Sequence, residues 1–295
     1  MINFADRLFE KTRSVNSVLC IGLDPHIEFI PPEFKKFGEE EALLNFSMGI
    51  LESFHRLVPA IKFQIAFYER LGSIGYSVLE KVIKRARELE IITIIDCKRG
   101  DIGTTARQYA RAYFEEKSPL ECDAVTLNPY LGYDSMKPFF SYLSEGKGAF
   151  ILVKTSNPSS SDIQDLKVNN NHRIYEIVGN KISEWGREYI GSRGYSSLGA
   201  VVGCTHPDEL TILRQELPDT LFLVPGYGAQ GGMDDDVAMA FDRNSGYGGL
   251  VCASRSIIFA YRDYKDKINY LDAAHTAYRK AVKNINIAIN KRIAG

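Results

Sequence analysis

The sequence has no excess of charge of either sign, no basic tract and no long apolar run. Its 36 Lys and Arg side chains nearly balance 37 Asp and Glu, so the net charge of the 295 residues is −1. Electrostatic binding to nucleic acid or to an acidic membrane surface is therefore not expected. No stretch of about 18 apolar residues exists to cross a bilayer, and the charged start MINFADRLFEKTR does not resemble a signal peptide. We expect a cytoplasmic chain with neither nucleic-acid nor membrane partners.

Cysteine and histidine are also scarce. The five cysteines are scattered in or beside apolar runs and form no C-x-x-C pair, which argues against zinc and a disulfide framework and favours buried, reduced thiols. The five histidines show no H-x-H or H-x-x-x-H spacing. Spacing alone leaves open a magnesium site built from Asp and Glu oxygens.

Short apolar runs recur along the chain, each nearly continuous rather than alternating. Such runs are typical of parallel strands covered on both faces. They are Val18–Leu23, Ala60–Gln64, Ile91–Asp96, Ala124–Leu127, Ala149–Val153, Gly199–Val202, Leu221–Val224 and Gly249–Ala253. Segments with helical periodicity lie between them, for example Glu80–Glu90.

Eight strands alternating with helices predict a single (β/α)8 TIM barrel over residues 1–295. The alternative is an open doubly wound sheet, which normally carries G-x-G-x-x-G after its first strand, where this chain has Leu23-Asp24-Pro25-His26. An N-terminal segment around Phe4 and a C-terminal helix beyond Lys267 are expected to cap the barrel and complete its outer layer. The long polar connection Thr155–Asn171 is expected to be a flexible excursion at the catalytic face.

The third apolar run ends in charge, as IITIIDCKRGDIGTT. Asp96 and Lys98 are two residues apart, so on a strand both side chains project from the same face, while Asp101 falls beyond the strand. Two carboxylates about 4 Å apart repel by about 4 kcal/mol at an effective dielectric of 20, and a lysine between them offsets that repulsion. Three such residues can also be a solvated loop end or a surface ion pair. Other residues of the chain are needed to tell whether this charged group lies on the surface or in a catalytic site.

Polar residues follow most of the other predicted strands. Because the C-terminal ends of barrel strands form the active site, we expect these residues to gather on one rim. They are Asp24, Lys62, Asp96, Lys98, Asp101, Asn128, Thr155, Ser156, Gln230 and Arg255. Two lysines at this rim would repel a divalent cation, which favours a metal-independent site.

The last two loops carry the features of a phosphate site. The seventh loop reads VPGYGAQGG, in which glycines let backbone amides approach a ligand and adopt positive φ. The eighth strand ends in Cys252–Ser256 and enters a helix with Ser254 and Arg255. Helix amides and an arginine fork suit a phosphate dianion, and these two loops are the usual phosphate position in barrels.

Together these motifs resemble the orotidine 5′-phosphate decarboxylase family, specifically its longer bacterial-type branch (type 2). The signature D-x-K-x-x-D-I stands at Asp96–Ile102, with IGLDP at the first strand, IKF at the second, and PGYGAQGG and SRSI at the last two. The resemblance implies a cofactor-free decarboxylation of orotidine 5′-monophosphate (OMP) to UMP and CO2 in de novo pyrimidine synthesis.

The resemblance also implies roles for individual residues. Lys62, Asp96, Lys98 and Asp101 would surround C6 of the orotate ring, and Lys98 would protonate C6. Asp24 would bind the ribose, Ser156 the pyrimidine edge, and Gln230 and Arg255 the phosphate. The full set of implied substrate-binding residues is Asp24, Ile102, Thr105, Asn128, Ser156, Pro225, Gln230, Gly231, Ser254 and Arg255.

The family further implies an obligate homodimer, in which Asp101, Ile102 and Thr105 reach into the neighbouring subunit's site. Two alternatives stay open. One is a magnesium-dependent sugar-phosphate decarboxylase or aldolase on the same barrel, such as 3-keto-gulonate-6-phosphate decarboxylase, although those enzymes place a carboxylate where Lys62 stands. The other is a non-catalytic UMP-binding protein, which would leave costly buried charge unused.

Overall fold

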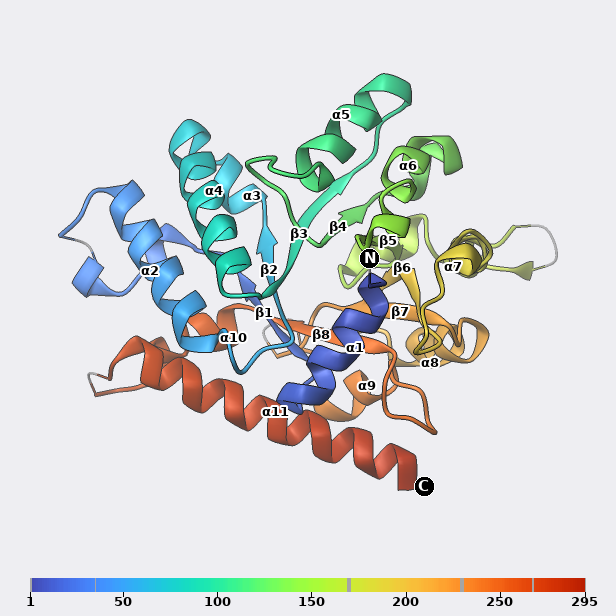
Figure 1. Cartoon of the computed structure of the whole chain (residues 1–295). Coiled ribbons are helices and arrows are strands. Elements are labelled where there is room, and N and C mark those ends of the chain that lie inside the picture. The colour runs from blue at the N-terminus through green and yellow to red at the C-terminus, as the bar shows by residue number, and fades with distance from the viewer. Residues whose placement is uncertain (1, 35, 169–170, 229–230, 267, 295) are drawn as a thin grey trace.

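The barrel predicted from the sequence is confirmed by a computed structural model that describes residues 2–34, 36–168, 171–228, 231–266 and 268–294. Within these ranges eight parallel strands close into a barrel in chain order, and β8 pairs with β1 (Figure 1). The strands are β1 Leu19–Leu23, β2 Ala60–Gln64, β3 Ile92–Arg99, β4 Ala124–Leu127, β5 Gly148–Lys154, β6 Ser196–Val202, β7 Thr220–Val224 and β8 Gly249–Ala253. Each overlaps one of the predicted runs.

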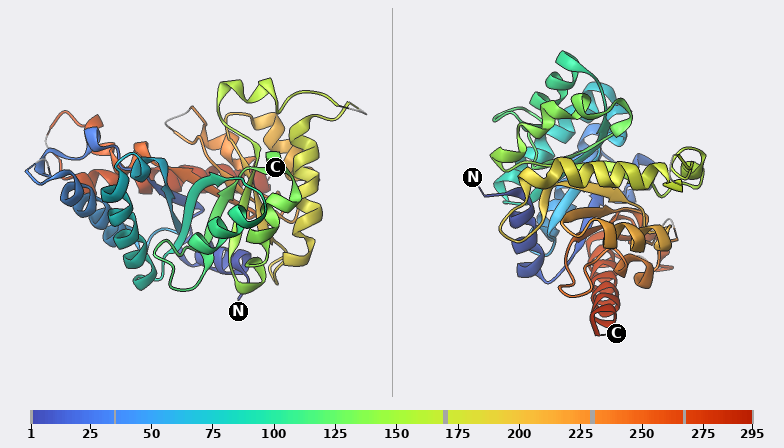
Figure 2. Two further views of the ribbon diagram at one scale, coloured as in Figure 1. Left: turned by 90° about the horizontal axis from the view of Figure 1, so that it is seen from above. Right: turned by 90° about the vertical axis from the view of Figure 1, so that its right-hand side faces the viewer.

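Helices surround the barrel on its outside (Figure 2). They are α1 Phe4–Val15, α2 Glu39–Phe54, α3 Ala66–Glu69, α4 Gly72–Glu88, α5 Gly103–Phe114, α6 Tyr133–Phe140, α7 Ile174–Gly186, α8 Pro207–Glu216, α9 Asp234–Ala238, α10 Arg255–Ile258 and α11 Tyr270–Ala294. In α4, Val78, Leu79, Val82 and Ile83 are fully buried at helical spacing while the charged face points outward. No described helix combines the length and the apolar character that crossing a membrane requires.

The N-terminal end of the barrel is closed by α1. Phe4 is fully buried and its ring meets the ring of Phe150 edge to face, with 6.0 Å between centroids. Gly148 makes room for this contact, because a Cβ there would lie 2.3 Å from Phe4. At the other end of the chain, α11 runs along the outside and packs on α9 and α10. The predicted capping by both terminal segments is confirmed.

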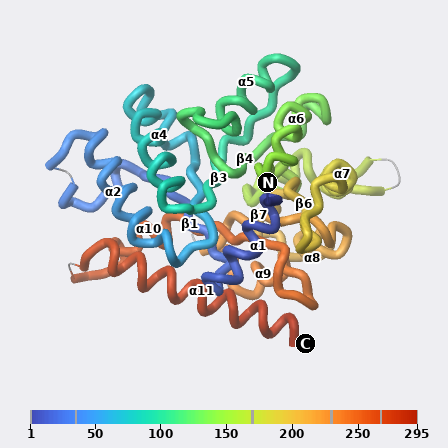
Figure 3. Tube along the Cα trace, in the orientation of Figure 1, coloured from blue at the N-terminus to red at the C-terminus, as the bar shows by residue number. Residues whose placement is uncertain are grey.

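Two further features bear on the site. All five cysteines are free and buried, as the sequence predicts. The chain between β5 and α7 projects from the barrel wall, beside α7 in the Cα trace (Figure 3). It contains the short 3-10 helix Pro158–Asp162, and its two sides pair through a bridge between Lys167 and Arg173.

Candidate active site

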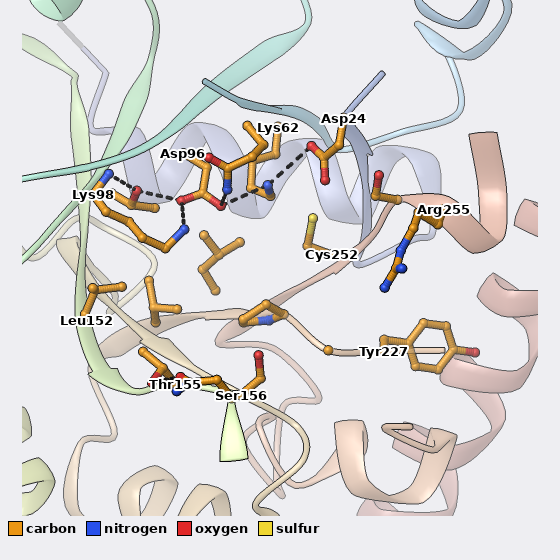
Figure 4. A pocket seen from close by; sticks show the side chains of 18 of the residues that line it. Asp24, Lys62, Asp96, Lys98, Leu152, Thr155, Ser156, Tyr227, Cys252 and Arg255 are labelled. Carbon is orange, nitrogen blue, oxygen red and sulfur yellow. Dashed lines mark hydrogen bonds and ion pairs between the residues drawn. The ribbon is translucent and has the colours of Figure 1, made fainter. Parts of the chain in front are cut away.

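A cavity of about 510 Å³ opens at the C-terminal ends of the strands, a size typical of small-molecule sites. Nine of the residues predicted for the site line it: Asp24, Lys62, Asp96, Lys98, Thr155, Ser156, Pro225, Ser254 and Arg255. Lys62 lies on β2 and Asp96 and Lys98 on β3, and the others come from the segments that follow β1, β5, β7 and β8. The rim expected from the sequence therefore brings most of its members into one cavity (Figure 4).

Asp96 is the centre of the charged group. Its Oδ2 lies 3.0 Å from Lys62 Nζ, and its Oδ1 lies 2.6 Å from Lys98 Nζ. Lys62 also faces Asp24, whose Oδ1 is 3.8 Å from Nζ. Carboxylates and ammonium groups thus alternate from Asp24 through Lys62 and Asp96 to Lys98.

Two residues that the sequence analysis missed complete the surroundings of Asp96. Gln64 Nε2 donates to Oδ2 at 3.0 Å, and the Thr126 hydroxyl donates to Oδ1 at 2.8 Å. Each carboxylate oxygen thereby receives one ammonium and one neutral donor. A signal for Gln64 existed, since it stands two residues after Lys62 on β2 and so faces the same side of the strand.

The backbone at Lys98 departs from a regular strand. Strand β3 continues past Asp96 to Arg99, but its register with β4 shifts between Ile95 and Arg99, and Lys98 has φ = 47°. A left-handed lysine is unfavourable in isolation. Here Thr126 stabilises it, because Oγ1 accepts a 2.9 Å hydrogen bond from the Lys98 N–H. The bulge aims the lysine side chain back at Asp96.

These contacts keep Asp96 and Lys62 charged. Burial alone would raise the pKa of the Asp96 carboxyl, but the charges of Lys62 and Lys98 outweigh burial and hold this pKa well below its usual range. Burial would lower the pKa of Lys62, yet Asp24 and Asp96 raise it well above its ordinary value. Both groups are therefore ionised at neutral pH.

Two buried polar atoms at the wall of the cavity make no hydrogen bond within the described residues: Asp24 Oδ1 and Ser254 Oγ. Burying a polar atom without a hydrogen bond is costly, and for Asp24 Oδ1, among the described residues, only the charge of Lys62 at 3.8 Å offsets that cost. Because both residues line the cavity, a polar ligand there can satisfy them. Gly22 keeps this region open, since a Cβ at Gly22 would lie 2.9 Å from Ser254 Cβ.

The glycine-rich loop after β7 is folded as its composition predicts. Gly226, Gly228 and Gly231 have φ of 100°, 74° and 97°. Backbone hydrogen bonds from Gly228 to Gly232 and from Gly232 to Gly226 close its base. Gln230 lies outside the described residues. Arg255 borders the cavity beside this loop, on the opposite side from Lys98 (Figure 4).

Five predicted site residues do not line the cavity of their own chain: Asp101, Ile102, Thr105, Asn128 and Gly231. Asp101 lies beyond β3, as expected, and its Oδ1 accepts the N–H of Ile102 at 2.8 Å. Ile102 is 59 % exposed, and Thr105 is exposed on the first turn of α5. Asn128 instead caps the 3-10 helix Pro129–Leu131 by accepting the Tyr130 N–H at 3.0 Å.

Comparison with known proteins places this arrangement in a family. Residues 17–267 match the orotidine 5′-phosphate decarboxylase / HUMPS family. The chain belongs to this family. Among curated relatives, the orotidine 5′-phosphate decarboxylase of Clostridium tetani is 41% identical over 290 residues, covering 97% of this chain and 99% of the relative. The enzyme of that name from Petrotoga mobilis is 46% identical over 265 residues, covering 88% and 90%.

Solved structures agree with the assignment to the decarboxylase family. The OMP decarboxylase of Leishmania donovani superposes with a TM-score of 0.78 at 30% identity, covering 98% of this chain and 99% of that one. The family resemblance drawn from the sequence motifs is thereby confirmed over nearly the whole chain. Among the described residues, no group of three or more His, Cys, Asp or Glu side chains is placed to hold a metal ion.

Proposed function

We propose that this protein decarboxylates OMP to UMP and CO2, as a carbon–carbon lyase of pyrimidine biosynthesis. The observation that carries the proposal is Asp96 held between Lys62 and Lys98 inside the cavity. Membership of the decarboxylase family supports the same reaction. The barrel acts as one catalytic domain over residues 1–295, and the reaction takes place in the cytoplasm.

In the proposed mechanism the orotate carboxylate lies against Asp96. The bond from C6 to the carboxylate breaks, CO2 leaves, and the electron pair stays on C6. Lys98 Nζ then gives its proton to C6 and regains one from solvent. Lys62 holds Asp96 in place and lies near the ribose, and Asp24 binds a ribose hydroxyl. The rate comes from charges fixed before the substrate arrives, which need no reorganisation during the reaction.

The phosphate of OMP binds away from the reacting carbon and contributes binding energy to the reaction. Arg255 at the start of α10, with Ser254 and Pro225, forms the proposed phosphate end. Gln230 and Gly231 are assigned to it from the family motif alone. Binding energy from the phosphate supplies part of a barrier reduction that spans about 8–23 kcal/mol in enzymes. Ser156 binds the pyrimidine edge, and Asn128 is assigned to substrate binding from the resemblance.

We further propose a homodimer in which Asp101, with Ile102 and Thr105, completes the partner subunit's site. In support, Asp101 does not line the cavity of its own chain and is followed by the exposed side chain of Ile102. The neighbouring loop after β4 adds Tyr130, which is 82 % exposed, and Leu131, which is 46 % exposed. Exposed apolar side chains grouped in this way mark protein–protein contact surfaces.

A direct assay tests the proposed reaction: the loss of OMP absorbance with purified protein in excess EDTA. Turnover is expected to continue, because no step requires a metal. Activity on a sugar phosphate that EDTA abolishes would instead support the magnesium-dependent alternative. Binding of UMP with no turnover of OMP would support the non-catalytic alternative. Either of these results would overturn the proposal.

A further inference from the structure

The chain after β5 forms part of the cavity wall. Thr155, Ser156 and Asn157 line the cavity, and so does Gln164, which returns to it after the 3-10 helix Pro158–Asp162. Figure 4 shows Thr155 and Ser156 across the cavity from Lys62 and Asp96. A base bound in the cavity would lie between these two sides.

Gln164 holds Thr155 through both ends of its amide. The Thr155 N–H donates to Gln164 Oε1 at 2.9 Å, and Gln164 Nε2 donates to Thr155 Oγ1 at 2.8 Å. The Thr155 hydroxyl in turn donates to Asn157 Oδ1 at 2.7 Å. The position of Thr155 is thus set by a side chain nine residues further along the chain.

An ion pair between buried Lys154 and half-buried Asp165 joins the residues next to Thr155 and Gln164. Lys154 is fully buried, and its Nζ lies 2.6 Å from Asp165 Oδ1 and 5.6 Å from the centre of the Tyr175 ring. A buried ammonium without a counter-ion is strongly destabilising. Lys154 and Asp165 therefore hold the two sides of the loop together next to Thr155 and Gln164.

Ser156 is also confined from the side of β6. The Thr205 hydroxyl donates to the Ser156 carbonyl at 3.1 Å. The backbone of Gly203 approaches so closely that a Cβ there would lie 2.8 Å from Ser156 Cα. Ser156 is thus held between the Gln164 contact and the end of β6.

We infer that Gln164 is a positioning residue that fixes the Thr155–Ser156 backbone as the wall against which the pyrimidine base binds. This inference rests on the proposed function, because it assigns the base rather than the phosphate to this side of the cavity. Gln164 acts through Thr155 and Ser156. Arg255, at the proposed phosphate end, borders a different part of the same cavity (Figure 4).

The test compares a ligand that has the base with one that lacks it. In Gln164→Ala, the affinity for UMP and the KM for OMP should each worsen about tenfold, the loss expected for removing hydrogen bonds worth about 1.4 kcal/mol. Binding of ribose 5-phosphate should stay unchanged. Gln164→Glu keeps the acceptor for the Thr155 N–H and should recover part of the loss. Ser161→Ala, an exposed change in the same loop, is the matched control.

Gly203→Ala provides an independent variant, because its added methyl group pushes on Ser156 from the opposite side. It should reproduce the selective loss of UMP binding. Wild-type affinity for UMP in Gln164→Ala, or an equal loss of UMP and ribose 5-phosphate, would overturn the inference. A failure of the proposed function would show differently, as a wild-type protein that does not convert OMP, whether or not it binds UMP.

Discussion

Lys98 Nζ lies 2.6 Å from Asp96 Oδ1, and the backbone of Lys98, one residue before the end of β3, is left-handed. A regular strand would point both side chains out of the same face without turning one toward the other. The bulge at Lys98 supplies that turn, so the proposed proton donor and the carboxylate beside it are in place before substrate binds.

Replacing Lys98 tests its role as the proton donor. Lys98→Ala should reduce kcat by about 10²- to 10⁴-fold, the range expected when a general acid is lost. The loss is expected because no other described ammonium group lies beside Asp96 Oδ1. Affinity for UMP should stay nearly unchanged, as measured by calorimetry. Catalysis retained in this variant would refute the role.

The Thr126 hydroxyl joins the Lys98 backbone to the Asp96 carboxylate. Thr126→Val keeps the shape but leaves the Lys98 N–H without its acceptor. We expect kcat to fall about ten- to a hundredfold, which corresponds to 1.5–3 kcal/mol for hydrogen bonds to charged groups. Thr126→Ser, which restores the hydroxyl, should recover most of kcat. Equal kcat values in the Val and Ser variants would show that the hydroxyl is not needed.

The lowered pKa of Asp96 predicts how stability changes with pH. In the unfolded chain the Asp96 carboxyl has a pKa near 3.8, so below that pH it binds a proton, whereas in the folded protein it stays ionised to lower pH. The stabilisation from Asp96 is therefore fully present above about pH 5 and is lost as the pH falls toward the folded pKa. Asp96→Asn should lower the free energy of unfolding in urea at pH 7, and its difference from wild type should shrink on acidification. The exposed change Asp162→Asn is the control, and a difference that stays constant with pH would contradict the prediction.

Mixed dimers test whether Asp101 is shared. Asp101→Ala and Lys98→Ala should each be inactive, but one site of their heterodimer would contain both native residues. Random pairing of equal amounts makes half of the dimers mixed, so activity should recover to about a quarter of wild type. Lys62→Ala mixed with Lys98→Ala should recover nothing, because both residues come from one chain's site. Persistent inactivity of a verified Asp101–Lys98 heterodimer would argue against sharing.

The sequence predicted the strands and the charged cluster well, for a physical reason. Buried parallel strands require nearly continuous apolar runs, so charges such as Lys62 and Asp96 within them stand out. Thr126 did not stand out, because threonine is common within strands and its role depends on pairing between β3 and β4. The bulge at Lys98 depends on the same pairing. Neither can be deduced from spacing along one strand.

The contacts within the chain after β5 could not be predicted from the sequence either. Its polar composition predicted an excursion at the catalytic face, and the cavity lining confirms that position. Composition could not show that Lys154 pairs with Asp165, or that Gln164 holds Thr155. These contacts depend on how the loop folds back, which no periodicity in the sequence records.

Because α1 closes the N-terminal end of the barrel, it limits how substrate can enter the cavity and how products can leave it. With Phe4 packed against Phe150 and Gly148, the described structure leaves the cavity a mouth at the strand C-termini. Substrate entering there must arrive with its base leading, because Asp96 lies deeper than Arg255 in the proposed binding mode. Carbon dioxide, released at the inner end, must then pass the nucleotide that produced it. A helix at the closed end of the barrel thus leaves both products the same mouth through which to leave.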